Sequence, residues 1–188
     1  MFLNSGVSDS LSAELGYAYS LTPSANLSAS LSYLDSQLDS VFGAGIGDPT
    51  LTFSRAPGVD ISISPWVPRQ IGTGISMILP TGKTSEGHSL GATVVAPFVG
   101  LVFPIGDSFS IFPGAMYMRS LDKTFTGKDL DLAVLDLGGG WLSSKGTWIR
   151  LYVALIRDLK SDESYYNSAI SVGRVLFANC ASIWVDVI

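Results

Sequence analysis

Several side chains that could do chemistry lie in one polar loop, residues 81–93. The run T-G-K-T at positions 81–84 is typical of loops that hold phosphate groups. Such a loop needs a further glycine five positions before Gly82, because its backbone must wrap the phosphate closely, and that position holds Met77. The run therefore predicts no nucleotide site.

His88 is the only histidine, and Ser85 and Ser89 stand close to it in the sequence. A serine hydrolase uses a histidine as its base and also needs an acid that orients the histidine. Neither such an acid nor a Gly-x-Ser-x-Gly turn is evident. We interpret His88 as a solvated loop residue and expect no enzyme.

Asp122, Asp129 and Asp131 could together bind calcium weakly, since carboxylates are ligands of that ion. They lack the regular ligand spacing of a calcium-binding loop, so a charged rim is the simpler interpretation. Cys180 is the single cysteine, which excludes an intramolecular disulfide. We predict no metal and no cofactor.

Charged residues inside otherwise apolar segments are more informative; they are Glu14, Asp131, Asp136, Arg150, Arg174 and Asp186. An Arg or Lys that faces lipid at the middle of a membrane costs about 2–4 kcal/mol. If the segments are membrane strands, Arg174 lies near a rim and the other five face a lumen or lie at a rim. Those five either line the path of a solute or pair with one another and fill the interior.

The segments that carry these charges alternate between apolar and small or polar residues, which is the period of a β-strand. Residues 11–21 and 27–33 show the pattern most clearly, with Leu, Ala and Tyr opposite Ser and Gly. Small hydroxyls on the second face suit a polar lumen. Further strands are predicted at residues 49–55, 71–79, 94–104, 109–120, 131–142, 148–157, 165–177 and 181–188.

The composition is that of a chain with too few charges for a soluble domain. Hydrophobic residues make up 47% and charged residues 14%, whereas soluble domains carry about 25% charged residues. No apolar run is long enough for a spanning helix of ~20 residues, but residues 94–104 match a tilted membrane strand of ~9–11 residues. A closed membrane barrel is therefore predicted, with a soluble β-barrel or sandwich as the alternative.

The net charge of −5 argues against nucleic acid as a partner, because phosphate binding needs Lys and Arg. Residues 1–10 have neither the basic nor the apolar region of a signal peptide. We predict a single domain over residues 1–188, in which residues 1–10 form an N-terminal segment that could be disordered.

The predicted connections alternate in length, which is typical of an outer-membrane barrel. Residues 22–26, 105–108, 143–147 and 178–180 are short turns, and residues 34–48, 81–93, 121–130 and 158–163 are longer loops. Aromatic residues flank them, as in the girdles at membrane interfaces: Tyr19, Phe103, Phe109, Trp141, Trp148, Tyr165 and Tyr166.

Ten strands with short turns on the periplasmic rim place both termini on the outer rim, where such barrels do not normally begin or end. We therefore expect the visible strands not to close by themselves. Either the chain is a fragment of a roughly twelve-stranded barrel, or the Pro-rich segment from Ala56 to Gln70 contributes another strand.

Two short motifs carry a resemblance to a known family. G-I-G-D-P-T-L at residues 45–51 opens a strand, and L-P-T-G at residues 79–82 follows another. Over residues 45–120 the chain resembles the transporter-type outer-membrane proteins of the meta-pathway of phenol degradation family. The resemblance implies a barrel in the bacterial outer membrane that passes small hydrophobic or aromatic compounds, and it transfers no binding residue.

We therefore predict an all-β, antiparallel, up-and-down transmembrane barrel of about ten visible strands. It would let small, mostly hydrophobic or aromatic molecules pass passively, with membrane lipid as its partner. The reason is that both faces of residues 94–104 are apolar, whereas a water-filled porin shows polar residues on one face. A soluble lipocalin-like carrier and a structural outer-membrane protein without transport are the alternatives.

Overall fold

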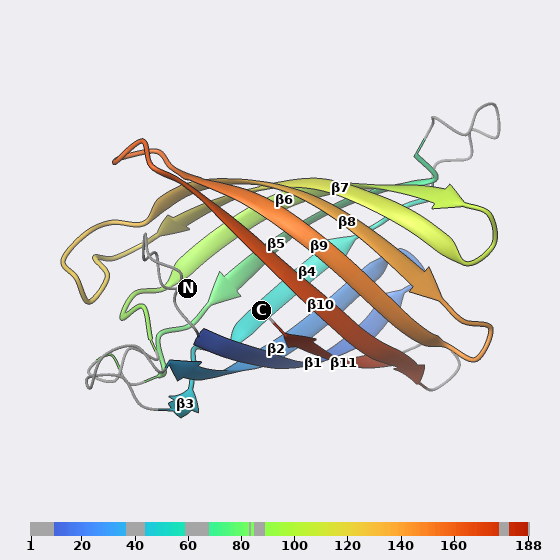
Figure 1. Ribbon diagram of the computed structural model, residues 1–188, viewed down its shortest axis with the longest axis horizontal. Coiled ribbons are helices and arrows are strands. Elements are labelled where there is room, and N and C mark those ends of the chain that lie inside the picture. The colour runs from blue at the N-terminus through green and yellow to red at the C-terminus, as the bar shows by residue number, and fades with distance from the viewer. Residues whose placement is uncertain are drawn as a thin grey trace.

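The computed structural model describes residues 10–36, 44–58, 68–82, 84, 89–176 and 181–187, and its strands form one antiparallel sheet (Figure 1). No helix in this part of the chain is long and apolar enough to cross a membrane. The strands are β1 (Ser10–Thr22), β2 (Ala25–Ser36), β3 (Ala44–Ile46), β4 (Thr50–Arg55), β5 (Gln70–Ile78), β6 (Val94–Ile105), β7 (Phe109–Ser120), β8 (Asp131–Leu142), β9 (Thr147–Asp158), β10 (Ser164–Leu176) and β11 (Ala181–Val187).

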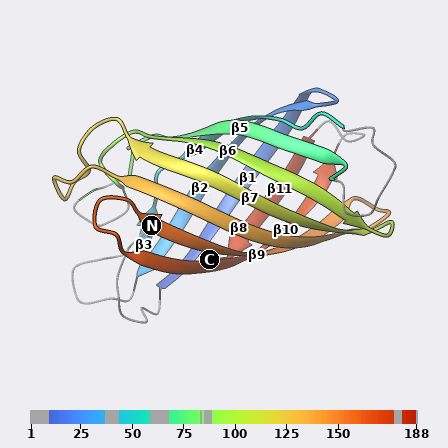
Figure 2. The ribbon, with the colours of Figure 1, turned by 90° about the horizontal axis from the view of Figure 1, so that it is seen from above.

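The sheet closes into a barrel, because β1 pairs with both β2 and β11. Ten strands form the wall, and β3 pairs only with the end of β2. Neighbours in the wall are neighbours in the sequence, which makes the topology up-and-down (Figure 2). The prediction of an all-β antiparallel barrel of about ten strands is confirmed.

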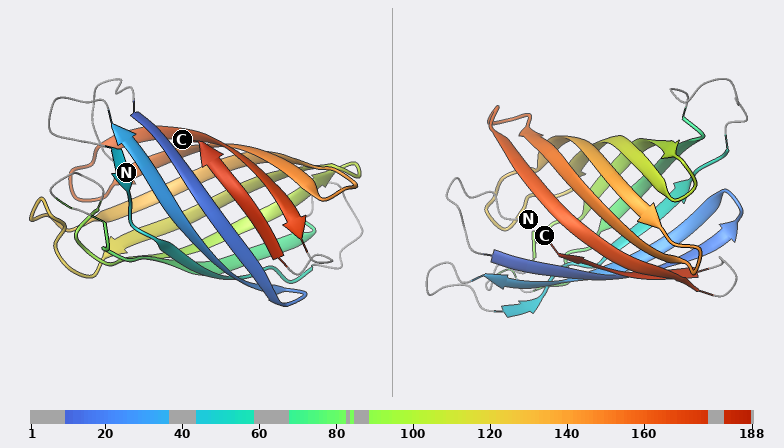
Figure 3. Two further views of the ribbon diagram at one scale, coloured as in Figure 1. Left: turned by 90° about the horizontal axis from the view of Figure 1, so that it is seen from below. Right: turned by 45° about the vertical axis from the view of Figure 1, so that its right-hand side comes forward.

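The expectation that these strands would not close by themselves is wrong. The strands β1 and β11 lie side by side in the wall (Figure 3), and their ladder runs from Ala13 opposite Val187 to Tyr19 opposite Ala181. An even number of strands makes the first and last strands antiparallel, so they can pair whichever rim holds the termini. Closure also satisfies backbone groups that an open sheet would leave unpaired.

The two rims of the barrel differ in their connections. The short-turn rim carries residues 23–24, 106–108 and 143–146, and the long-loop rim carries residues 79–82, 89–93, 121–130 and 159–163. Since the strands alternate in direction, β1 begins and β11 ends at the long-loop rim. The strand parity read from the sequence is therefore correct, although the conclusion drawn from it about closure is not.

The segment from Ala56 to Gln70 adds no strand to the wall, because β4 pairs directly with β5 from Thr50 opposite Ile78 to Arg55 opposite Thr73. A single bridge between Gly58 and Gln70 extends that ladder. The extra wall strand expected in this segment is thus wrong, and residues 59–67 lie outside the described residues, as do residues 1–9.

The region predicted as one loop, residues 34–48, contains the short strand β3. Both β3 and β4 lie along the same edge of β2, with Tyr33 opposite Ile46 and Ser30 opposite Thr50. Three steps along β2 therefore match four steps on the other chain segment, so one extra residue is accommodated between Ile46 and Thr50. Such a β-bulge bends the strand and re-aims a side chain, and here the segment contains Asp48.

Alternation along each strand gives the barrel an apolar outer face. Every wall strand exposes at least one large hydrophobic residue there, among them Leu15, Leu27, Leu51, Ile71, Val99, Phe109, Leu135, Leu151, Ile170 and Ile183. Leu135 is 60% exposed although it lies in the middle of β8. We call this surface the outer belt.

The polarity of the lumen face differs between the strands of the barrel. On β2 and β4 it carries hydroxyl side chains, including Ser28, Ser30 and Thr52. On β6 to β9, toward the long-loop rim, it carries a buried apolar cluster formed by Val94, Ala96, Met118, Leu132, Val134, Ala154 and Ile156. Both faces of β6 are thus apolar, which makes the lumen unlike that of a water-filled porin.

Candidate functional site

The charged residues predicted for the lumen or the rims fall into two groups. Glu14, Asp136 and Arg150 lie on the lumen face, since their sequence neighbours Leu15, Leu135 and Leu151 are exposed on the outer belt. The register places Asp186 opposite Glu14, and the side chain of Asp186 lies outside the described part of the structure. The other group, Asp131 and Arg174, lies on the outer face.

Asp131 and Arg174 mark opposite edges of the outer belt. Asp131 is the first residue of β8, at the long-loop rim, where it lies opposite Arg119 of β7. Its Oδ1 atom is buried and has no hydrogen-bond partner among the described residues. Arg174 lies near the end of β10, at the short-turn rim, opposite Thr147. Neither residue therefore faces the lumen.

Three of the predicted charged positions belong to one row of paired residues that crosses four strands. Arg150 of β9 pairs with Ser171 of β10, which pairs with Asp186 of β11, which pairs with Glu14 of β1. Neighbouring strands lie about 4.8 Å apart, so the row spans roughly 14 Å. Since barrel strands tilt, the row climbs the wall from Arg150, near the short-turn rim, toward Glu14.

The guanidinium of Arg150 lies near one carboxylate and two aromatic rings. Its Nη2 atom lies 4.0 Å from Oδ1 of Asp136. Its guanidinium lies 5.4 Å from the ring centre of Phe112 and 5.5 Å from that of Tyr152, which is the range of cation–π contacts. The Arg150 side chain is nevertheless 42% exposed. A lumen-facing side chain with that exposure requires accessible space inside the barrel.

Large lumen side chains lie against the wall, because glycines stand beside them on the neighbouring strands. A Cβ atom on Gly16 would fall 2.0 Å from the ring of Trp184, and one on Gly173 would fall 2.3 Å from the ring of Trp148. Both are directly paired positions in the ladders. The same arrangement places Phe98 over Gly74, Phe112 over Gly140 and the Asp136 carboxylate over Gly114. Because these glycines have no Cβ atom, the large side chains have room to lie along the wall of the lumen.

The two tryptophans form a second row beside the charged one. Trp148, Gly173, Trp184 and Gly16 are paired in that order across β9, β10, β11 and β1. Each lies two residues from a member of the charged row, on the same face of its strand. The predicted girdle is therefore only partly outward: Trp141 and Phe109 are exposed on the outer belt, whereas Trp148 faces the lumen.

Asp48, in the bulge between β3 and β4, is a residue whose role the sequence did not reveal. Its Oδ1 accepts hydrogen bonds from the backbone N–H groups of Thr81 and Gly82, both at 2.9 Å. Its Oδ2 accepts from Ser89 Oγ and from the Leu90 N–H, again at 2.9 Å. The two motifs at residues 45–51 and 79–82 thus meet at one carboxylate.

The segment that Asp48 holds covers the apolar cluster at the long-loop rim. Leu90 packs against the cluster, and Ala92 is 1% exposed. Backbone hydrogen bonds from Phe125 N–H to Leu90 and from Leu121 N–H to Thr93 join this segment to the next loop. Asp48 therefore fixes the loops on this side of the barrel mouth.

The remaining loop residues considered for chemistry form no catalytic arrangement among the described residues. Lys83, Ser85 and His88 lie outside that part of the chain, and Ser89 is buried and bonded to Asp48. Asp129 instead pairs with Lys160 at 2.6 Å. No group of His, Cys, Asp and Glu in the described residues could hold a metal ion.

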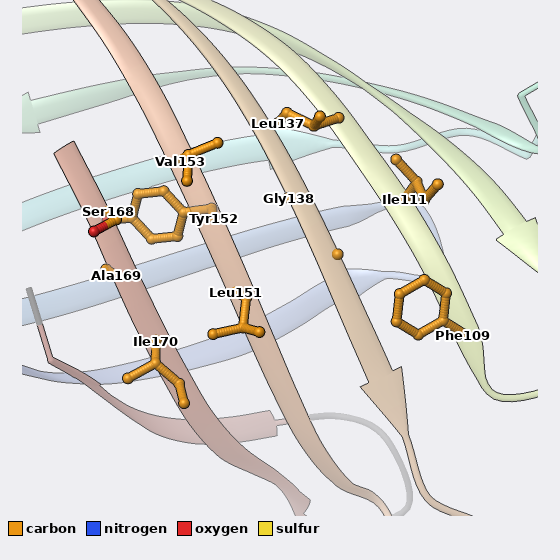
Figure 4. Close-up of a pocket in the computed structure, with 11 residues that line it drawn as sticks. Phe109, Ile111, Leu137, Gly138, Leu151, Tyr152, Val153, Ser168, Ala169 and Ile170 are labelled. Atoms are coloured by element: carbon orange, nitrogen blue, oxygen red, sulfur yellow. The ribbon is translucent and has the colours of Figure 1, made fainter. Parts of the chain in front are cut away.

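An apolar groove of about 770 Å³ lies on the outer belt over β7 to β10 (Figure 4). It follows the glycines of β8, where Gly139 leaves a gap beside Phe109 and Leu151. The groove faces outward, so it belongs to the outer belt and not to the lumen.

No protein-family model matches the chain, and no curated protein matches it. Among solved structures, the crystal structure of an outer membrane channel from Pseudomonas putida F1 is similar, with a TM-score of 0.59 and 12% sequence identity. The match covers 95% of this chain and 94% of that chain. At that identity the similarity shows a shared barrel fold, and the resemblance to the phenol-degradation family stays a prediction.

Proposed function

We propose that this chain is a channel of the bacterial outer membrane that lets small, mostly hydrophobic or aromatic molecules pass passively. The outer belt is the observation that carries the proposal. A contiguous apolar surface all round a closed wall has no favourable place in water, whereas it matches the ~25 Å apolar band of a membrane barrel. The similarity to a channel structure agrees with it.

The exposure of Arg150 supports passage through the barrel. Its side chain is 42% exposed and that of Asp136 is 25% exposed, although both face inward. Solvent therefore reaches the lumen at that level. If the charges merely filled the interior, their side chains would be buried against one another.

The lining of the lumen supports apolar and aromatic solutes. Rings of Phe98, Trp148 and Trp184 lie along the wall over glycines, and the apolar cluster occupies the opposite, long-loop end of β6 to β9. Aromatic and apolar walls bind apolar solutes by excluding water from both surfaces. Sugars would find few hydrogen-bonding groups along β6, whose lumen face is apolar.

The outer belt disfavours the soluble carrier. A lipocalin-like protein keeps its apolar residues inside and its outer face polar. Here large side chains such as Leu135 and Leu151 are exposed by 60% and 58%.

Liposome swelling tests the proposal. Vesicles that contain the purified barrel should take up phenolic solutes faster than sugars of similar mass, and empty vesicles provide the baseline. Faster entry of sugars would contradict the apolar path. Absence of any uptake above the baseline would favour a structural outer-membrane protein instead.

A further inference from the structure

We propose that Arg150 binds the carboxylate of aromatic acids in the lumen of the barrel. The site lies near the short-turn rim, and three rings stand beside it, those of Phe112, Tyr152 and Trp148. The proposal narrows the solute class of the proposed function, and its role in transport rests on that function. Binding itself does not depend on transport.

The first argument is that hydrogen-bond donors of Arg150 lack acceptors. A guanidinium carries five N–H groups and no acceptor. Its Nη2 atom lies 4.0 Å from Oδ1 of Asp136, which is longer than a hydrogen bond. Its Nε atom has no hydrogen-bond partner among the described residues, and the side chain as a whole is 42% exposed. A solute that enters the lumen can therefore supply acceptors to this guanidinium.

The second argument is that the guanidinium is fixed in position. It lies over Gly138, where a Cβ atom would fall 3.2 Å from Nε of Arg150. Gly138 is paired with Phe112 on β7 and with Tyr152 on β9, and the guanidinium carbon lies 5.4 and 5.5 Å from the centres of those two rings. Cation–π contacts hold the planar group there, and its fork of N–H groups matches the two oxygens of a carboxylate.

The third argument is the aromatic surface next to the guanidinium. Trp148 lies two residues from Arg150 on the same face of β9, about 6.8 Å along the strand, and its ring lies over Gly173. Tyr152 has the same spacing on the other side of Arg150. A carboxylate bound to Arg150 would therefore place an attached ring beside one of these two rings. Offset-stacked and edge-to-face ring pairs are favourable, so an aromatic acid gains a contact that an aliphatic acid lacks.

The charges near the site require the solute to compete with one acid. Among the described strands, Arg150 is the one Lys or Arg on the lumen face, and Asp136 faces the same guanidinium. At 4.0 Å that acid forms no hydrogen bond to Arg150. A solute carboxylate that forms two charge-assisted hydrogen bonds has the stronger interaction and can therefore bind beside Asp136.

Isothermal titration calorimetry in non-ionic detergent would test the site with three probes, and titrations into empty micelles provide the baseline. Benzoate is the aromatic anion, nitrobenzene is its neutral isostere, and cyclohexanecarboxylate is an anion of similar size without an aromatic ring. We expect saturable binding of benzoate and at least about tenfold weaker binding of nitrobenzene, which cannot form a charge-assisted hydrogen bond as strong. Cyclohexanecarboxylate should bind roughly threefold more weakly than benzoate. Either probe binding as tightly as benzoate would overturn the proposal.

Substitutions of arginine locate the binding. Arg150→Gln should weaken benzoate binding at least about tenfold, because it removes the charged donor. Arg150→Lys keeps the charge but loses the planar fork, so it should retain part of the affinity. Arg174→Gln, on the outer face, is the matched control and should leave binding unchanged. Benzoate binding that Arg150→Gln does not affect would refute the site.

Asp136→Asn distinguishes a lost site from a damaged fold. This substitution removes the acid that competes with the solute for Arg150, so benzoate should bind about threefold more tightly. A gain in affinity cannot result from unfolding. Weaker binding in this variant would contradict the competition between Asp136 and the solute, on which the proposal depends.

Conductance and solute uptake separate this inference from the proposed function. A barrel that binds benzoate but shows neither conductance in planar bilayers nor uptake of phenolic solutes would retain the site and lose the channel. A barrel that takes up phenolic solutes but does not bind benzoate would retain the channel and lose the site. Conductance that benzoate blocks in the unmodified protein, but not in Arg150→Gln, supports both.

Discussion

The ring of Trp184 lies directly over the backbone of Gly16, its paired residue on β1, and a Cβ atom at position 16 would fall 2.0 Å from Cζ2 of that ring. No real Cβ contact is so short, so any larger residue at position 16 must displace the tryptophan. The pair also lies in the ladder that closes the barrel. The absence of a Cβ atom at Gly16 therefore sets the position of Trp184 in the lumen, at the ladder that joins the first and last strands.

Gly16→Ala should destabilise the barrel by about 1–3 kcal/mol, the usual cost of forcing a side chain out of a packed position. Gly72→Ala is the matched control, because a Cβ there would meet only the Gly100 oxygen, at 3.6 Å. Urea unfolding measures the difference, and near-ultraviolet circular dichroism reports the movement of the ring. Equal midpoints for the two variants would show that Trp184 does not rest on Gly16.

Arg150→Gln should raise the preference of the pore for K⁺ over Cl⁻, because it removes the lumen cation beside Asp136. We expect the permeability ratio to rise at least about twofold, since charges in a low-dielectric passage strongly change the local ion concentration. Reversal potentials across a KCl gradient measure the ratio. Arg174→Gln, on the outer face near the short-turn rim, should leave it unchanged.

Alternation along each strand was enough to predict the barrel class, because it assigns every strand an apolar outer face and a small or polar inner face. It could not predict closure. The pattern in β1 and β11 shows which side chains face the lumen, but backbone groups decide which edges meet, and these are the same in every residue. The sequence predicts a loop where β3 lies, because a strand of three residues is too short to show alternation.

The lumen positions of Glu14 and Arg150 could be predicted from parity, because both lie on the polar face of a strand, whereas parity gave no such assignment for Asp136. The place of Trp184 could not be predicted, since it depends on the register that puts Gly16 opposite, and register is a property of two strands. The sequence identifies Asp48 only as part of a motif. Three of its four donors are backbone N–H groups, at Thr81, Gly82 and Leu90, and these leave no signal in a sequence.

Asp48→Asn should loosen the loop that follows β5. The asparagine side chain has an NH₂ donor in place of one acceptor oxygen. In one orientation this NH₂ group would face the N–H groups of Thr81 and Gly82. In the other it would face the Ser89 hydroxyl and the Leu90 N–H. Hydrogen bonds to a charged group are worth about 1.5–3 kcal/mol, so amide exchange at Leu90 should accelerate at least about tenfold. Asp122→Asn, in the next loop, should leave that rate unaltered. Unchanged exchange in Asp48→Asn would mean that Asp48 does not fix the loop.

The pair between Asp129 and Lys160 should respond to acid. The hydrogen bond and the charge of Lys160 lower the pKa of Asp129 below its ordinary value of 3.8. A lowered carboxyl pKa favours the folded loop at pH above 3.8, and this contribution is lost as the pH falls through the folded pKa. A carboxyl titration by NMR should show the lowered value, and Lys160→Gln should raise it. An unchanged pKa in that variant would show that the pair does not form in solution.

Closure of the barrel between β1 and β11 can be tested by a cross-link. Tyr17 and Ile183 are directly paired on the outer face, and paired Cα atoms of antiparallel strands lie about 4.5–5.5 Å apart. Disulfides form over Cα distances of about 4.4–6.8 Å, so Tyr17→Cys with Ile183→Cys should oxidise readily once Cys180 has been replaced by alanine.

Tyr17→Cys with Val187→Cys is the control, since the second cysteine lies four residues further along β11, roughly 13 Å away. Mass spectrometry after oxidation measures the yield. An open sheet would leave the two edges apart, and the first pair would then oxidise no faster than the control; a yield clearly above the control fixes both the seam and its register.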